Sequence, residues 1–208
     1  LLIDTGASHG LFLNTESSSK IMIPPKNISC TIGKGLGGVI TGRLARIGKL
    51  NIGRYEIPNM IASFPDPNTY ILDTLRTGRS VYRNGSLGGE VLSRFIVIFD
   101  FPSEKIYVKP NRGFRKQSYY NMSGVTVRAT GPRLRDFEVI EVREKSPAAA
   151  VDIKLGDKIF SINNMLTSEM DLSEVNGYFN YKPGKRINMK IIRGAEMIEK
   201  EIKLINEI

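Results

Sequence analysis

Apolar and polar residues alternate over short runs through most of the first half of the chain, a pattern typical of β-strands that bury one face. Runs of this kind cover residues 43–47, 49–53 and 94–101. A polar turn at residues 100–104 separates the last of these from a further run at 105–108, which predicts a hairpin. Because turn signals recur about every 8–12 residues, we expect the first half to form a closed, barrel-like β lobe.

The second half combines strand-like runs with one amphipathic helix. Strands are predicted at residues 137–142, 158–162, 187–192 and 198–204. The helix is expected to begin near Asp171, whose carboxylate can cap the first turn, with Glu174 as its capping-box partner. Gly177 costs the helix about 1 kcal/mol relative to Ala, so a short helix is expected. The predicted fold class is therefore mainly β, a barrel-like lobe followed by an α+β domain.

Length and composition are those of ordinary globular domains. The 208 residues suggest one or two domains, and the Pro/Gly/polar stretch at residues 110–118 favours two. The longest apolar runs are strand-sized, so no membrane-spanning helix is predicted. A single cysteine, Cys30, excludes an intrachain disulfide, and with one histidine it suggests no zinc site.

The formal net charge of +9 raises the question of nucleic-acid binding. Lysines and arginines are spread along the chain and mostly alternate with apolar residues, as they do on solvated strand faces. No nucleic-acid-binding motif accompanies the charge, so no nucleic-acid partner is predicted.

The sequence Asp-Thr-Gly-Ala-Ser at residues 4–8 carries the clearest candidate chemistry. The apolar residues 1–3 predict a buried strand, and a sharp turn at Gly6 would leave the Asp4 carboxylate at the strand end. Taken alone, the triplet also fits an Asx-type turn that closes a strand. A glycine-rich hairpin signal follows at residues 33–39, and the pair Leu87-Gly88 later opens a short helix.

In this order, the three motifs resemble a retropepsin-type aspartyl protease lobe over roughly residues 1–110. The resemblance implies that Asp4 is the catalytic acid and base, that Thr5 braces a paired loop and that Gly6 shapes the turn. It also implies a flap over the substrate, formed by Gly35, Gly37 and Gly38. An inert β-hairpin turn is the alternative interpretation of those glycines. In the family the segment with the second glycine, here Gly88, threads close beside the catalytic loop.

Aspartic proteolysis requires two carboxylates that share one proton, because two like charges so close cannot both ionise. The ionised carboxylate activates a water, and no metal or other cofactor is needed. The chain has one Asp-Thr-Gly, so the second carboxylate is expected from another copy of the chain or from an upstream lobe. We therefore expect residues 1–208 to be inactive as a monomer. With three residues before Asp4, the chain is expected to be a fragment whose first strands and any export signal lie upstream.

The rest of the chain resembles a PDZ domain of the bacterial kind, at residues 123–208 after a linker at 111–122. The strongest match is Ser-Pro-Ala-Ala-Ala at residues 146–150, followed by a Gly-Asp pair and a strand that ends in Ile-Asn-Asn. Asn164 stands where glycine is usual, and asparagine tolerates a left-handed backbone. Glycine is also expected near Asp152, so that turn is predicted to have an altered shape.

The PDZ resemblance implies a peptide site made by one loop and one helix face. The residues concerned are Ser123, Gly124, Val125, Thr126, Leu172 and Val175. Backbone N–H groups of the loop would bind a C-terminal carboxylate, and the next strand would pair with the peptide. A loop that merely starts a strand is the alternative.

Together the two resemblances predict an aspartic endopeptidase lobe that acts on polypeptide substrates, with a PDZ domain that binds peptides or regulates the lobe. The competing hypothesis is a catalytically silent lobe whose PDZ domain recruits partners. The order of domains is similar to bacterial aspartyl proteases with tandem lobes. That similarity suggests a periplasmic or extracellular location, which the residues themselves leave open.

Overall fold

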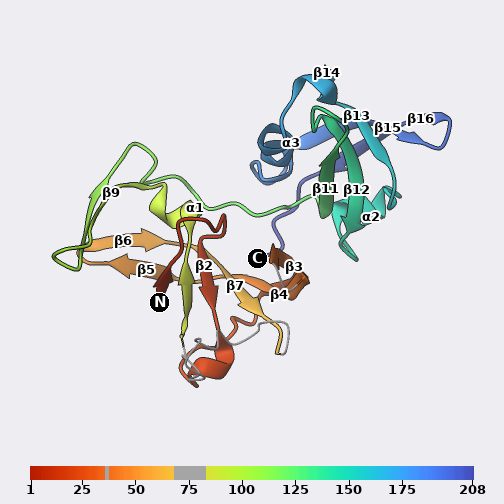
Figure 1. The fold of residues 1–208 in the computed structure, drawn as a ribbon. Helices are drawn as coiled ribbons and strands as arrows, with labels where there is room; N and C mark the ends of the chain where they lie inside the picture. Colours follow the sequence, from red (N-terminus) through yellow and green to blue (C-terminus); the bar gives the residue numbers. More distant parts are fainter. Residues whose placement is uncertain (36–37, 68–82) are drawn as a thin grey trace. The chain divides into compact units, whose positions relative to one another are not determined.

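The computed structural model describes residues 1–35, 38–67 and 83–208, and strands dominate both halves of it (Figure 1). The chain divides into two compact units, Leu1–Ser118 (grouped with Ile208) and Tyr119–Glu207. The predicted mainly β class is confirmed. The division falls between residues 118 and 119, inside the segment predicted as a linker at 111–122, and residues 111–118 belong to the first unit.

The first unit contains a six-stranded sheet in the order β1-β8-β2-β7-β4-β3. Its strands are β1 (Leu2–Ile3), β2 (Leu11–Leu13), β3 (Asn27–Gly35), β4 (Gly38–Arg46), β7 (Ile61–Pro65) and β8 (Gly85–Leu87). Within the described residues no strand ladder joins β3 to β1, so the sheet is an open path there. β1 and β8 are parallel, and β2 is antiparallel to β8 and parallel to β7.

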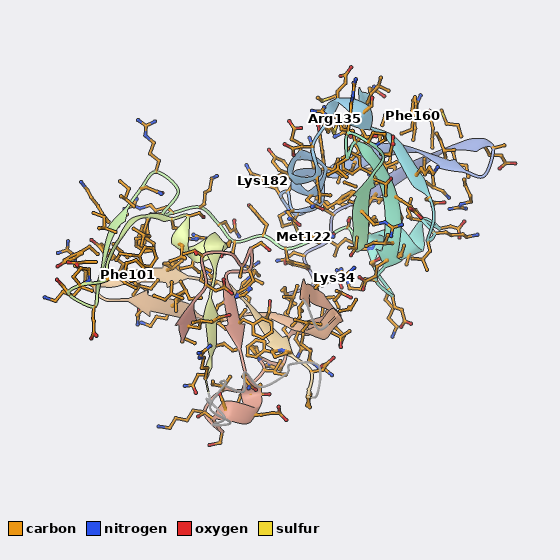
Figure 2. All side chains as sticks on the ribbon, in the orientation of Figure 1. Lys34, Phe101, Met122, Arg135, Phe160 and Lys182 are labelled. Atoms are coloured by element: carbon orange, nitrogen blue, oxygen red, sulfur yellow. The ribbon has the colours of Figure 1, made fainter. Side chains whose placement is uncertain are left out.

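Two hairpins and short helices complete the first unit. They are η1 (Thr15–Ser17), β5 (Lys49–Ile52), β6 (Tyr55–Pro58), α1 (Gly89–Leu92), β9 (Phe95–Asp100) and β10 (Lys105–Pro110). The predicted hairpin around residues 100–104 is confirmed, with Asp100 paired to Lys105. Phe101, in the turn of this hairpin, is 82% exposed (Figure 2).

The alternating pattern of the first half gives two buried clusters. One contains Ile57, Met60, Leu87, Val91 and Phe95, and the other contains Leu11, Ala45, Ala62 and Phe64. Leu87 and Val91 come from β8 and α1, so the segment that pairs with β1 and the start of the Asp4 loop is anchored in the core.

The predicted burial of residues 1–3 is wrong. Leu2 and Ile3 of β1 are 39% and 38% exposed. Their strand is the last in the sheet and pairs only with β8 among the described residues, so its apolar side chains are covered on one side alone. Apolar composition predicted a strand correctly, but burial depends on what lies against it.

The second unit is a twisted sheet in the order β11-β12-β13-β15-β16, with β14 paired to β13 (Figure 1). Its elements are β11 (Val125–Thr130), β12 (Asp136–Val142), α2 (Pro147–Ala150), β13 (Lys158–Ile162), β14 (Met165–Leu166), η2 (Thr167–Glu169), α3 (Leu172–Phe179), β15 (Arg186–Arg193) and β16 (Glu196–Lys203). All four predicted strands of this half are present within two residues of their expected bounds.

Helix α3 begins where its sequence predicts. The Asp171 carboxylate accepts the N–H of Glu174, and the Glu174 carboxylate accepts the N–H of Asp171, which is a complete capping box. The helix has eight residues and continues through Gly177 without a break, in line with the short helix expected. Val175 and Phe179 are fully buried and fix the helix on the sheet.

In two turns of this unit, a residue other than glycine adopts the left-handed backbone conformation that glycine usually provides. Asn164 has φ 66° and Asp152 has φ 59°, both in the left-handed region. The altered shape predicted for the turn at Asp152 is therefore not found. The Asp152 carboxylate also forms an ion pair with the Arg193 guanidinium, with 3.1 Å between Oδ2 and Nη1, which helps to hold the turn.

Candidate functional site

Asp4 lies at the end of β1, where the chain leaves the sheet. Its own N–H donates to the carbonyl of Leu87 in β8 at 2.9 Å. Its Oδ1 accepts the N–H groups of Gly6 at 3.0 Å and Ala7 at 3.1 Å. This arrangement is an Asx-type turn that fixes one carboxylate oxygen, while Oδ2 has no hydrogen-bond donor in the described part of the chain. Asp4 is half-buried, whereas Thr5 and Gly6 are exposed.

The close approach predicted at Gly88 is confirmed. A Cβ at this position would lie 2.3 Å from the carbonyl oxygen of His9 and 3.0 Å from that of Ala7. The N–H of Gly88 donates to Gly10 at 2.9 Å, and the N–H of Gly89 donates to Ala7 at 2.7 Å. A side chain would prevent these bonds, so glycine is required by the space available.

His9 contributes a link that the sequence analysis did not find. Its Nε2 lies 2.9 Å from the Oγ of Ser86, a residue 77 positions away in β8. Burial lowers the pKa of His9 below its ordinary value of 6.5, and the negative charge of Asp4 opposes part of this shift. His9 is therefore neutral near pH 7 and lies within electrostatic reach of the candidate carboxylate.

A partly buried ion pair next to the loop was also not predicted. Arg94 is 4% exposed and donates to Glu90 at 2.5 Å and to Ser118 at 2.9 Å. The N–H of Glu90 in turn donates to the carbonyl of His9 at 3.3 Å. Neither the spacing nor the residue types distinguish Arg94 from the many exposed arginines of the chain, so no sequence signal identified it.

The predicted flap falls on a long hairpin. β3 and β4 pair from Asn27 and Ala45 outward to Gly35 and Gly38. Gly38 has φ 114°, which requires glycine. Gly37, the third predicted flap residue, lies outside the described residues. The described residues thus show an antiparallel strand pair at this position, and the predicted flap over a substrate stays a prediction.

The predicted PDZ loop uses its polar groups to hold itself together. The N–H of Gly124 donates to the Asn121 side chain at 3.0 Å, and the N–H of Val125 donates to the Ser123 hydroxyl at 3.1 Å. The Asn121 amide donates back to the carbonyl of Val125 at 2.6 Å. These two N–H groups are therefore already paired within the loop, whereas a loop ready to bind a terminal carboxylate would present unpaired N–H groups.

The other predicted peptide-site residues divide between core and surface. Val125 and Val175 are fully buried in the core of the second unit. Leu172 is 38% exposed, and Thr126 is half-buried in β11. β11 is the outermost strand of its sheet in the described residues, so one of its edges has no strand beside it.

In the described parts of the chain, no three His, Cys, Asp or Glu side chains gather where they could hold a metal ion. None of the described helices is long and apolar enough to span a membrane.

Two family models match this chain. Residues 1–91 match the aspartyl protease model, and residues 111–204 match the PDZ domain model. The predicted order, an aspartyl protease lobe followed by a PDZ domain, is thereby confirmed. No curated protein matches the sequence.

Several solved structures resemble parts of the chain. The photosystem II D1 C-terminal processing protease is 14% identical, with a TM-score of 0.36 over 40% of this chain and 24% of its own. The HtrA3 PDZ domain bound to a phage-derived ligand is 21% identical, with a TM-score of 0.32 over 39% of this chain and 80% of its own. A serine endoprotease from Yersinia pestis is 19% identical, with a TM-score of 0.39 over 78% and 60%. This chain thus spans about a quarter of the first of these proteins and under two thirds of the last.

Proposed function

We propose that the first unit is one lobe of an aspartic endopeptidase and that Asp4 is one of its two catalytic carboxylates. The observation that carries the proposal is the Asp4 turn at the end of β1, together with the match of residues 1–91 to the aspartyl protease model. The N–H groups of Gly6 and Ala7 hold Oδ1 in place. Oδ2 has no protein donor in the described residues and is thus the atom that can meet a water or a second carboxyl group.

The reaction follows from two such carboxylates held close together. They share one proton, because both cannot ionise at short distance. The ionised one takes a proton from a water, the water attacks the scissile carbonyl, and the protonated one donates to the carbonyl oxygen. In the resulting tetrahedral diol, the carboxyl group that took the proton from the water passes it to the amide nitrogen, the other carboxylate takes a proton from a diol hydroxyl, and the C–N bond breaks. The acid and amine products then leave without a covalent enzyme intermediate.

The second carboxylate comes from another lobe or another copy of the chain. The sequence contains one Asp-Thr-Gly, and the exposed Thr5 lies beside Asp4, where a paired loop would meet it. The hairpin of β3 and β4, which ends at Gly35 and resumes at Gly38, is the flap that closes over the bound polypeptide in this proposal.

The second unit acts as a peptide-binding or regulatory domain in this proposal. The free edge of β11, which contains Thr126, is the place where an extended peptide can add as a strand. Leu172 is the exposed apolar residue of the predicted helix face. The internal bonds of Gly124 and Val125 mean that a terminal carboxylate would have to compete with Asn121 and Ser123.

The experiment that tests the catalytic role is Asp4→Asn in the paired protein. Asparagine keeps the shape but removes the titratable proton, so turnover should fall by about 10²–10⁴ or more. The melting temperature should hold steady or rise, because a neutral amide relieves carboxylate repulsion. Asp100→Asn, in the turn of the β9–β10 hairpin, is the matched control and should retain activity. Cleavage by Asp4→Asn at the parent's rate would refute the proposal.

The requirement for pairing is tested separately. Fractions of residues 1–208 resolved by size should show peptidase activity only in a paired form. Clear activity in a strictly monomeric fraction would contradict a second carboxylate supplied from elsewhere.

Because the sequence contains a single Asp-Thr-Gly, a second function is also considered, in which the lobe is catalytically silent and the PDZ domain recruits partners. Inactivity of the paired protein on a diverse peptide library, with peptide binding by the second unit intact, would favour it.

A further inference from the structure

A cavity of about 540 Å³ opens in the second unit beside helix α3, away from the edge of β11. It lies between the helix, β14 and the start of β15. The residues that line it are Asn163, Met165, Met170, Glu174, Gly177, Tyr178, Tyr181, Lys185 and Ile187. Its size and its mostly apolar wall are those of sites that take a small molecule or a peptide side chain.

Gly177 shows that this face of α3 is kept open. Glycine within a helix costs about 1 kcal/mol relative to alanine, so its presence needs a reason. Its φ is not left-handed, and a Cβ built on it would meet nothing within 4 Å. Neither backbone geometry nor packing therefore requires glycine at this position. What glycine does here is leave space in the wall of the cavity.

The wall favours an aromatic ring. Met165 is 52% exposed and Met170 is buried, so one thioether lies at the mouth and the other at the floor. Thioether sulfur makes favourable contacts with aromatic rings, worth about 0.3–1.5 kcal/mol each. Tyr178 and Tyr181 add rings that can stack or meet edge to face. The hydroxyl of Tyr178 lies 3.3 Å from the sulfur of Met165, which positions both at the mouth.

The rim favours an acidic neighbour of that ring. Lys185 lines the cavity and Lys182 lies beside α3 (Figure 2). In the described residues neither ammonium group forms an ion pair. The one carboxylate of the lining, that of Glu174, already accepts the N–H of Asp171 through Oε2 at 2.8 Å. An acidic group on the ligand would therefore meet cations that have no other protein partner here.

We propose that this cavity is a second peptide-recognition site of the PDZ unit, which binds an internal aromatic residue flanked by acidic residues. It is separate from the β11 edge and needs no terminal carboxylate. It also involves no part of the protease-like lobe, so it stands or falls independently of Asp4.

The absence of tryptophan from the chain provides a direct assay. The probe is the peptide acetyl-Asp-Trp-Asp-amide, which has both ends blocked, and its tryptophan fluorescence is read against a protein without that signal. The full chain should bind it saturably. Absence of binding at any practical concentration would overturn the proposal.

Two substitutions at one position identify the cavity as the binding place. Gly177→Leu fills it and should weaken binding at least tenfold, whereas Gly177→Ala adds one methyl group and should stay within about twofold of the parent. Because a Cβ at residue 177 meets nothing, both variants should fold, and a melting temperature at or above the parent's confirms it. Unchanged binding by Gly177→Leu would overturn the proposal.

The charge component is tested by Lys185→Gln. Affinity should fall several-fold, and the difference from the parent should shrink as salt is raised. A matched peptide with Asn in place of both Asp residues should bind the parent and Lys185→Gln equally. An equal effect of the lysine substitution on both peptides would contradict the acidic specificity.

Discussion

The two candidate loops of this chain differ in which of their polar groups are taken up by internal hydrogen bonds. In the first unit, the loop of residues 4–10 is bound mainly through backbone groups, since the N–H groups of Gly88 and Gly89 donate to carbonyls of that loop. In the second unit, the N–H groups of Arg143 and Ala148 likewise donate to the carbonyls of Gly124 and Ser123, and the loop's own side chains, Asn121 and Ser123, also take up the local N–H groups. In the first loop Asp4 uses Oδ1 to accept the N–H groups of Gly6 and Ala7, and Oδ2 accepts no bond from the described residues, whereas the N–H groups of Gly124 and Val125 in the second loop are both paired within the loop.

This difference bears on the two proposed activities. Asp4 keeps one carboxylate oxygen without a donor among the described residues, which suits the proposed catalytic role. The second unit offers its unsatisfied surface elsewhere, at the edge of β11 and in the cavity beside α3. The two units should also respond differently to substitution. The first should be sensitive to added volume where backbone segments approach closely, and the second to the removal of buried polar groups.

The largest stability effect is expected from Gly88→Ala in the first unit. The added Cβ would lie 2.3 Å from the backbone oxygen of His9, so either the loop or β8 must move. Overpacking of this kind costs about 1–3 kcal/mol, and a clash with backbone belongs at or above the upper end. Chemical denaturation with hydrogen exchange resolved by unit should show the loss in the first unit alone. Gly48→Ala is the control, because its Cβ meets nothing within 4 Å. An equal loss of stability in this control would contradict the explanation by a clash with the backbone.

The corresponding change in the second unit is Asp157→Ala. Asp157 is 1% exposed and accepts two bonds from Arg193, at 2.7 and 2.8 Å, and one from the N–H of Lys154 at 2.8 Å. Removal of a buried, charge-assisted partner should cost about 2–3 kcal/mol. The control is Glu201→Ala, whose pair with Arg186 is exposed and should matter by less than about 1 kcal/mol. A comparable loss from both would show that burial of the Asp157 pair is unimportant.

The sequence predicted best those features whose cause is local. The capping box of Asp171 and Glu174 depends on residues three apart, and the hairpin around residues 100–104 on a turn between two alternating runs. Both were correct, as was the close approach at Gly88, which followed from a family resemblance. Asp4 could be identified as a candidate because its motif is contiguous.

Features that depend on distant neighbours were missed. Exposure of Leu2 and Ile3 is decided by which strands lie beside β1. The His9–Ser86 contact joins positions 77 apart, and the burial of Arg94 depends on Ser118 and α1. The cavity beside α3 is likewise made by segments that only the fold brings together. No local pattern contains that information.

A smaller effect is expected from loss of the α3 cap. Asp171→Ala removes the acceptor for the N–H of Glu174 and should destabilise the second unit by about 1 kcal/mol. Ser173→Ala, in the same turn and with no side-chain hydrogen bond to any described residue, is the control. Hydrogen exchange should show faster opening of the second unit only for Asp171→Ala. Equal protection in both variants would mean that the capping box does not stabilise the helix.

The smallest expected effect is a difference between the two units in how their stability depends on pH. The pKa of His9 is lowered from 6.5 by burial, so the unfolded chain binds a proton that the folded first unit does not. The first unit should therefore be fully stable above pH 6.5 and lose stability as the pH falls from 6.5 toward the folded pKa. In the second unit, burial disfavours ionisation of Asp157, but bonds from Arg193 and the Lys154 N–H still hold its pKa below 3.8. Stability from that pair should persist down to about pH 3.8 and be lost only below it.

Because His9 is the one histidine of the chain, its ring gives a single titrating NMR signal that tests the first half of this prediction directly. The midpoint should lie below 6.5. In Asp4→Asn it should fall further, since the negative charge that favours the protonated ring is gone. A midpoint at or above 6.5 would contradict the burial argument. An unchanged midpoint in the variant would show that Asp4 does not act on His9, and the two residues would then belong to electrostatically separate parts of the loop.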